Sequence, residues 1–173
     1  MTTTIRALDA KPASYNGEEI LPALPFGKYS DIENHWAKET IERFTWIGYG
    51  PEGELFRPDE EITGEDFISL CNTVRIYGDS EEIAQLDALT RMQAVKLVID
   101  CLGYGKIASL KNVFITDFAD NSDFLEDDIG YAAIARGFGL IEGDGENFRP
   151  YDTLSRAEAV TIIENAITLG VLN

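Results

Sequence analysis

A six-residue segment that occurs twice constrains the fold of this chain more than any other feature. The segment GELFRP at residues 53–58 returns as GENFRP at residues 145–150. The match extends to three further pairs of positions: Tyr29-Ser30-Asp31 with Phe118-Ala119-Asp120, Gly48 with Gly139, and Ile62-Thr63 with Leu154-Ser155. Units of this length stack on one another because a single unit cannot bury its own apolar face. The chain is therefore predicted to contain at least two copies of one unit.

Each copy is predicted to fold as a helix, a glycine-rich loop and a second helix. In the first copy, a helix from about His35 to Ile47 carries an apolar stripe at helical spacing and is followed by glycines. The stripe consists of Trp36, Ile41, Phe44 and Ile47, and the glycines are Gly48, Gly50 and Gly53. In the last copy, the corresponding helix spans about Asp127 to Phe138 and is rich in alanine.

Three positions, and not two, carry the signature of a second helix. Thr63, Thr90 and Ser155 are each followed three residues later by a side chain that can accept a hydrogen bond, as in a capping box. The residues after them repeat an apolar i, i+3, i+4, i+7 pattern. The three stripes are Phe67, Leu70, Cys71 and Val74; Ala94, Leu97, Val98 and Cys101; and Ala159, Ile162, Ile163 and Ala166. They predict an all-α fold with a central three-helix bundle of pseudo-threefold symmetry.

The spacing of these helix starts shows that the middle repeat is shortened. Thr63 and Thr90 are 27 residues apart, whereas Thr90 and Ser155 are 65 apart. Only a helical turn or two fits between Gly78 and Leu89. We expect a single domain at residues 26–173, with repeat 1 at 26–77, a truncated repeat 2 at 78–113 and repeat 3 at 114–173. Residues 1–25, with three prolines, are expected to form an extended arm that covers the surface left open by the lost helix.

Charge restricts the class of partner. With 31 acidic and 14 basic residues, the chain has a formal net charge of -17, which repels nucleic acid and anionic membranes. A polyanionic partner could bind only through local Arg or Lys side chains, and the alternative is that the charge serves solubility alone. No apolar run reaches the roughly 20 residues of a membrane helix, so membrane insertion is not expected. Residues 1–24 lack the apolar core of a signal peptide.

Taken together, these motifs resemble the S-layer homology family. Its repeat runs from Phe-x-Asp through a Trp-Ala helix and a Phe-Arg-Pro loop to a helix that starts Thr-Arg-Ala-Glu. The matching segments here are Tyr29-Ser30-Asp31, His35-Trp36-Ala37, Gly48, Phe56-Arg57-Pro58, Ile62-Thr63 and Leu154-Ser155-Arg156-Ala157-Glu158. The resemblance covers about residues 26 to 173. It implies a pseudotrimer with grooves between neighbouring repeats.

The resemblance also implies a function. The family binds secondary cell-wall polysaccharide, often pyruvylated, without a covalent bond on Gram-positive-type cell surfaces. It thereby holds attached domains of longer surface proteins on the wall. A secreted, cell-wall location is therefore expected, with no catalytic residues, no cofactor and no metal. The alternative is a degenerate module that kept the fold for protein-protein interaction or a structural role.

Two arginines are the leading candidates for ligand contact. Arg91 and Arg156 hold the Arg position of the final motif, at the first turn of their helices. A guanidinium grips a carboxylate with two parallel donors, and the backbone N–H groups of a helix start also favour an anion. The alternative is that each arginine pairs with a neighbouring acid or packs its stem on the next helix.

The other candidates each have a structural alternative. Trp36 could stack on a sugar ring or lie in the core. Asp31 and Asp120 could accept hydrogen bonds from sugar hydroxyls or cap the following helix, which the sequence favours. Gly48 and Gly139 would keep the turn or a ligand free of a side chain. Arg57 and Arg149 are second-rank contacts, because a role in pinning their loops is favoured.

Departures from the family pattern limit the number of working grooves. Gly64 stands where the first repeat should have its arginine, and Asp127 stands where Trp36 would align in the third. One or two competent grooves are therefore expected. An enzyme is disfavoured because the single His35 has no nucleophile placed by motif, and acidic pairs in so acidic a chain are mostly solvated surface. Residues 143–147 cluster oxygens as a calcium loop does, but lack its ligand spacing and are expected to form a turn.

Overall fold

The structure is a computed structural model that describes residues 13–15, 18–20, 27–78, 81–141 and 146–168. Most of the predicted arm at residues 1–25 lies outside the described residues. Residues 142–145, which include most of the turn predicted at 143–147, also lie outside them. The described part of the arm is a short antiparallel hairpin of β1 (Ala13–Tyr15) and β2 (Glu18–Ile20). The predicted role of the arm as a cover falls outside the described residues.

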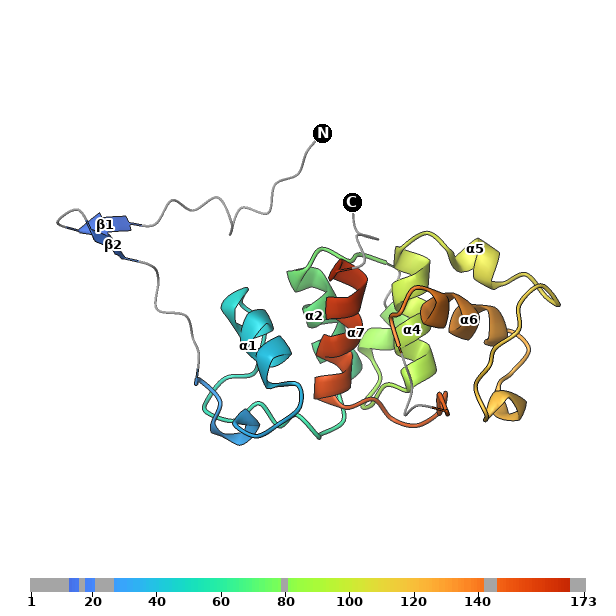
Figure 1. The fold of residues 1–173 in the computed structure, drawn as a ribbon, viewed down its shortest axis with the longest axis horizontal. Coiled ribbons are helices and arrows are strands. Elements are labelled where there is room, and N and C mark those ends of the chain that lie inside the picture. Colours follow the sequence, from blue (N-terminus) through green and yellow to red (C-terminus); the bar gives the residue numbers. More distant parts are fainter. Residues whose placement is uncertain (1–12, 16–17, 21–26, 79–80, 142–145, 169–173) are drawn as a thin grey trace.

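The rest of the described chain is helical, which confirms the all-α prediction (Figure 1). Its elements are η1 (Ser30–Ile32), α1 (Lys38–Trp46), α2 (Gly64–Thr73), α3 (Glu81–Ala84), α4 (Arg91–Cys101), α5 (Gly105–Ala108), η2 (Asn121–Asp123), α6 (Ile129–Gly137) and α7 (Arg156–Thr168), where η denotes a 3-10 turn. The second helices α2, α4 and α7 begin directly after the predicted caps. The Thr63, Thr90 and Ser155 hydroxyls each accept a hydrogen bond from the backbone N–H three residues on.

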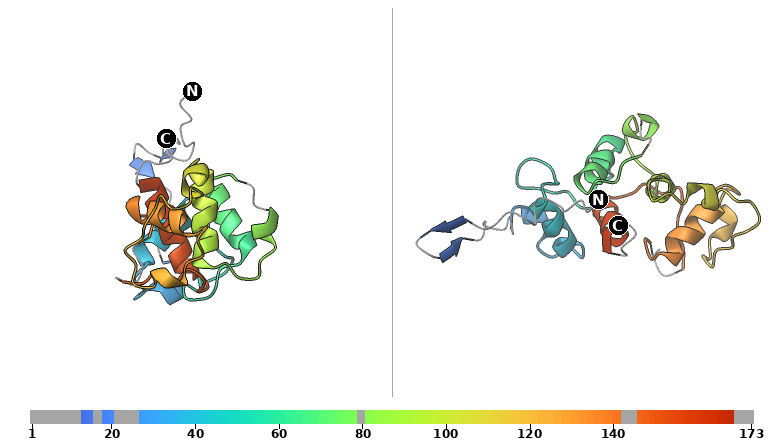
Figure 2. Two further views of the ribbon diagram at one scale, coloured as in Figure 1. Left: turned by 90° about the vertical axis from the view of Figure 1, so that its right-hand side faces the viewer. Right: turned by 90° about the horizontal axis from the view of Figure 1, so that it is seen from above.

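The second helices form the centre of the molecule, and the first helices pack around them. Helix α7 contacts both α2 and α4 (Figure 2). The three apolar stripes are buried or half-buried. Each first helix packs on the second helix of another repeat: α1 on α7, α3 on α2, and α6 on α4. This cyclic pairing is what a pseudo-threefold arrangement requires, although the symmetry itself stays a prediction.

Three backbone segments join in a ring at one end of this bundle. The Ile62 N–H donates to Leu154 O at 2.9 Å, the Leu154 N–H to Leu89 O at 2.7 Å, and the Leu89 N–H to Ile62 O at 3.1 Å. All three side chains are fully buried. Each residue directly precedes a helix-capping Thr or Ser. The ring therefore fixes the starting points of α2, α4 and α7 relative to one another.

The shortened middle repeat packs tightly against the start of α2. Its first helix is reduced to the four-residue α3, as the spacing predicted. The Gly64 N–H donates to Leu86 O at 2.8 Å, and a Cβ atom on Gly64 would lie 1.7 Å from the carbonyl oxygen of Ile83. The absence of a side chain at Gly64 therefore lets the remnant of repeat 2 lie directly on α2.

The first helix of repeat 1 differs from the prediction in its apolar stripe. Ile41 and Phe44 are buried, but Trp36 is 66% exposed and Ile47 lies at the surface. Helix α1 starts at Lys38, so Trp36 precedes it in a turn and does not follow its helical spacing. The core interpretation of Trp36 is therefore wrong.

No helix among the described residues combines the length and the apolar character needed to cross a bilayer.

Acid should weaken the contact between α1 and α7. Burial raises the pKa of Glu164, but hydrogen bonds from Arg43 at 2.5 Å and Thr40 at 2.6 Å outweigh it and hold that pKa below its usual value. A carboxylate with a lowered folded-state pKa contributes stability above its unfolded pKa of about 4.3 and loses it as pH falls through the folded value. We expect Glu164→Gln to lose less stability than the unmodified chain between pH 6 and roughly pH 3, measured by urea unfolding.

The exposed Glu39 provides the matched control, because Arg43 also contacts it, at 3.8 Å. Glu39→Gln should leave the pH profile of stability nearly unchanged, since exposed pairs contribute little. Equal profiles for Glu164→Gln and the unmodified chain would contradict the assignment.

Candidate functional site

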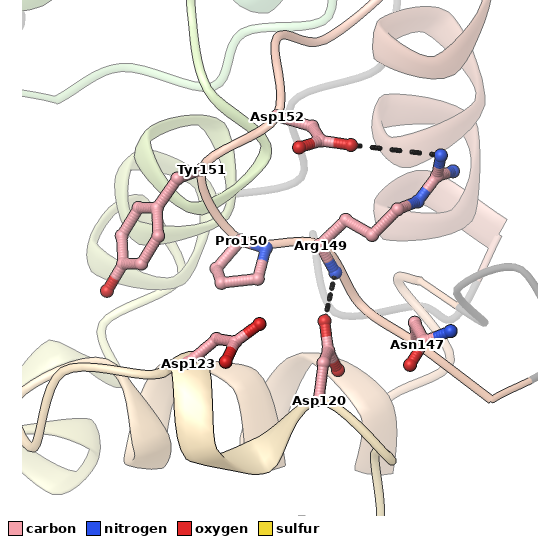
Figure 3. A pocket seen from close by; sticks show the side chains of 7 residues that line it. All are labelled: Asp120, Asp123, Asn147, Arg149, Pro150, Tyr151 and Asp152. Carbon is pink, nitrogen blue, oxygen red and sulfur yellow. Dashed lines mark hydrogen bonds and ion pairs between the residues drawn. The ribbon is translucent and has the colours of Figure 1, made fainter.

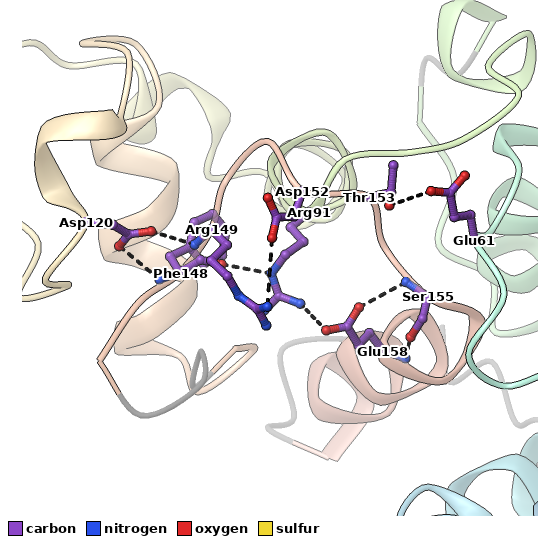
Figure 4. A network of polar contacts seen from close by, with 9 residues as sticks. All are labelled: Glu61, Arg91, Asp120, Phe148, Arg149, Asp152, Thr153, Ser155 and Glu158. Atoms are coloured by element: carbon purple, nitrogen blue, oxygen red, sulfur yellow. Dashed lines mark hydrogen bonds and ion pairs between the residues drawn. The ribbon is translucent and has the colours of Figure 1, made fainter.

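Arg91 lies inside the protein and not at its surface. The residue is only 6% exposed; its Nε donates to Phe148 O at 2.8 Å, and its Nη1 pairs with Glu158 of α7 (Figure 4). Its guanidinium carbon lies 5.6 Å from the centre of the Phe148 ring. This arginine therefore joins the start of α4 to the third-repeat loop and to α7.

Arg156 repeats the same arrangement one step around the bundle. Its Nη1 pairs with Asp66 of α2 at 2.6 Å, and its guanidinium carbon lies 5.6 Å from the Phe56 ring centre. Its Nε is buried, and the Nε–H group of Arg156 makes no hydrogen bond to the described residues, whereas the Nε–H group of Arg91 donates one.

The third arginine–acid pair that would complete this cycle, between α2 and α4, is missing both partners. Arg91 reaches the third residue of α7, and Arg156 reaches the third residue of α2. The corresponding pair would join position 64 to the third residue of α4, and these positions hold Gly64 and Gln93. The arginine and its acidic partner are therefore both absent where α3 closes over α2.

The backbone at the two arginine-bearing helix starts is already occupied. At α4, the Arg91 and Met92 N–H groups donate to Asp152 O at 3.0 Å and Pro150 O at 2.9 Å. At α7, the first two N–H groups donate to the carbonyls of residues 60 and 58, both at 2.9 Å. The expectation that these N–H groups attract an anion is therefore wrong. Ligand contact by the two arginine side chains stays a prediction.

The two aspartates fasten the Phe-Arg-Pro loops. Asp31 accepts from the N–H groups of residues 56 and 57 at 2.9 and 2.7 Å, and Asp120 accepts from those of residues 148 and 149 at 3.0 and 2.7 Å. Neither side chain makes a helix-cap hydrogen bond, so the capping interpretation is wrong. Arg57 and Arg149 have positive φ angles of 59° and 56°, a conformation that these carboxylates hold in place.

Since the loop backbone is held by aspartate, the loop arginines can point outward. The Arg57 side chain is 57% exposed, with Glu60 at 3.9 Å, and the Arg149 side chain is 46% exposed, with Asp152 at 3.8 Å. The carboxylates of Asp31 and Asp120 hold the loop backbone, and a pinning role for Arg57 and Arg149 stays a prediction. Gly48 and Gly139 also have positive φ angles, and a Cβ atom on either would meet no neighbour, so the turn is what requires glycine.

Trp36 forms an exposed aromatic surface beside the first loop. Its ring centre lies 5.3 Å from that of His35, whose Nε2 lies 3.2 Å from the Asp59 carboxylate. The Ala37 N–H donates to His35 Nδ1 at 3.1 Å, so Nε2 carries the proton that Asp59 accepts. This bond ties the Trp36 turn to the loop that presents Arg57.

The third-repeat loop borders an open pocket of about 320 Å³ (Figure 3). It is lined by Asp120, Asp123, Asn147, Arg149, Pro150, Tyr151 and Asp152. Sequence reasoning missed Tyr151, which aligns with Asp59 of the first loop and belongs to no motif. The Tyr151 hydroxyl donates to Asp128 at 2.7 Å and accepts from the Leu125 N–H at 3.0 Å. Asp128, only 1% exposed, is also paired with Lys96.

The comparison with protein families bears on this repeat. Residues 127–160 match the family model of the S-layer homology domain, a span that contains α6, the third Phe-Arg-Pro loop and the start of α7. This stretch of the chain is therefore similar to an S-layer homology domain. S-layer homology domains anchor proteins to cell walls and surfaces and are binding modules rather than enzymes. The extension of the domain to residues 26–126 stays a prediction. A comparison with curated proteins found no match.

Proposed function

We propose that this chain anchors a surface protein by binding an anionic, pyruvylated secondary cell-wall polysaccharide at its Phe-Arg-Pro loops. The observation that carries the proposal is the first loop, where an outward-facing Arg57 follows a turn that exposes Trp36. A pyruvyl ketal places a carboxylate on a sugar ring. A guanidinium can bind that carboxylate through two donors, and an indole ring can cover the apolar face of the sugar.

The acidic field of the molecule makes local arginines necessary for such a ligand. A net charge of -17 repels a polyanion at long range, so binding must come from short contacts. We therefore expect moderate salt to change the affinity little or to raise it. A steep loss of affinity with salt would count against short-range recognition.

One or two grooves are proposed to work. The groove that position 64 would serve lacks its arginine and is covered by α3. At the other two, Arg91 and Arg156 support the grooves through their pairs with Glu158 and Asp66. Arg149, Asp120 and Gly139 in the third repeat, and Asp31 and Gly48 in the first, are proposed to shape the ligand-facing loops.

Sedimentation with cell walls tests the proposal. The folded chain is mixed with Gram-positive-type walls that retain their secondary polymer, and with the same walls stripped of it. Binding should need the polymer, and Arg57→Ala should weaken it about tenfold, since a hydrogen bond to a charged group contributes about 1.5 kcal/mol. Trp36→Ala should weaken it by up to about tenfold through the loss of aromatic contact with the sugar. Arg75→Ala and Trp46→Ala, at other exposed positions, provide matched controls. Full binding by the Arg57 and Trp36 variants would refute the assignment.

A second candidate function, protein-protein interaction, is favoured by one surface segment. Four large apolar side chains are exposed there: Ile107 in α5, and Leu110, Val113 and Ile115 between α5 and η2. The same wall assay separates the two functions. If Val113→Ser with Ile115→Ser abolishes wall binding while Arg57→Ala does not, the interaction function replaces the anchoring one.

A further inference from the structure

The two cysteines lie on different helices but face the same small space. Cys71 lies on the apolar stripe of α2, and Cys101 is the last residue of α4. Both line a pocket of about 50 Å³, together with Ile68, Asn72, Ile76, Tyr77, Gly78 and Leu97. A space of that size holds no more than a water molecule or two, so the two cysteines lie near each other on its walls.

The chain between the helices holds this arrangement closed. The Ile76 N–H donates to Cys71 O at 2.9 Å, which turns the chain back after α2. A Cβ atom on Gly78 would lie 2.4 Å from the Cys101 sulfur, so the backbone passes directly over that thiol. Both sulfurs are therefore held where the truncated repeat leaves only the short α3 beside α2.

We propose that Cys71 and Cys101 form an intramolecular disulfide that joins α2 to α4 when the chain meets an oxidant of the disulfide class. The half-exposed Cys101 reacts first: its thiolate attacks a sulfur of oxidised glutathione, forms a mixed disulfide and releases one glutathione thiolate. The Cys71 thiolate then attacks the Cys101 sulfur and releases the second. The two cysteines lose two protons and two electrons, and glutathione disulfide is reduced to two thiols.

The reaction should be slow at neutral pH and faster in base. Burial, and then the nearby Cys101, raise the pKa of Cys71 to about 12. Burial, and then the Asp100 charge, raise the pKa of Cys101. Because the thiolate is the attacking species, the rate should rise steadily from pH 7 to pH 9.

The test treats the native chain with oxidised glutathione, without denaturant, and measures intact mass, linked peptides and thermal unfolding. We expect a product lighter by two hydrogen atoms, a Cys71–Cys101 peptide after proteolysis, and a higher Tm that returns to its starting value with dithiothreitol. Cys71→Ser should instead accumulate the mixed disulfide at Cys101.

Two outcomes would overturn the proposal. One is a native chain that gains glutathione on Cys101 but never loses it to Cys71. The other is an internal disulfide that forms only in denaturant, or that lowers the Tm, since the native positions of the thiols would then not match a disulfide.

Discussion

Replacement of Gly64 by alanine should destabilise the domain by at least about 3 kcal/mol, although alanine is normally the better helix former. The added Cβ would lie 1.7 Å from the Ile83 carbonyl oxygen, a distance that no side-chain rotation can relieve. Either α3 moves away and uncovers the face of α2, or the start of α2 shifts and strains the ring of backbone hydrogen bonds. Urea unfolding monitored by circular dichroism measures the loss.

Gly137→Ala is the matched control for this experiment. Gly137 also lies in a helix, has no positive φ angle, and a Cβ there would meet no atom within 4 Å. That change should be neutral or stabilise by up to about 1 kcal/mol. If Gly64→Ala behaves like Gly137→Ala, α3 does not pack on α2 as described.

Replacement of Arg91 by alanine should also cost about 3 kcal/mol, which is more than most surface charges contribute. The change removes a buried guanidinium from Glu158 and from the Phe148 carbonyl, and leaves Oε1 of Glu158 and the carbonyl oxygen without this donor. The effect falls at the lower end of the range for buried pairs because Glu158 is partly exposed. Urea unfolding again provides the measurement.

A second substitution separates the charge from the packing. Glu158→Gln keeps the capping box with Ser155 but removes the unpaired charge, so adding it to Arg91→Ala should recover part of the loss. Arg57→Ala, at an exposed arginine, should change stability by less than about 0.5 kcal/mol. A loss below about 1 kcal/mol for Arg91→Ala would mean that this pair does not hold the repeats together.

Much of the fold could be predicted because its signals are local. Helix caps at Thr63, Thr90 and Ser155 depend on residues three apart, and the apolar stripes depend on spacings within one helix. The short α3 follows from the lack of chain between two caps. The four-residue α5 was not predicted, because so short a helix has neither a capping residue nor an apolar stripe that the sequence could show.

The roles of the candidate side chains were harder to predict because they depend on contacts across repeats. A motif gives Arg91 its place at a helix start, but not the carboxylate 67 residues away that covers it. Asp31 looked like a cap because it precedes a helix, whereas its partners are N–H groups 25 and 26 residues later. Trp36 was assigned to a helical stripe by spacing, but the helix starts after it.

The ring that joins Ile62, Leu89 and Leu154 sets an order of events for a newly made chain. Its last member lies near the end of the sequence, and α1 finds its packing partner only in α7. The first repeat therefore emerges from the ribosome long before the surface that buries it exists. The bundle can therefore close only once α7 has been made, and any product that stops before α7 should remain unfolded and open to proteases.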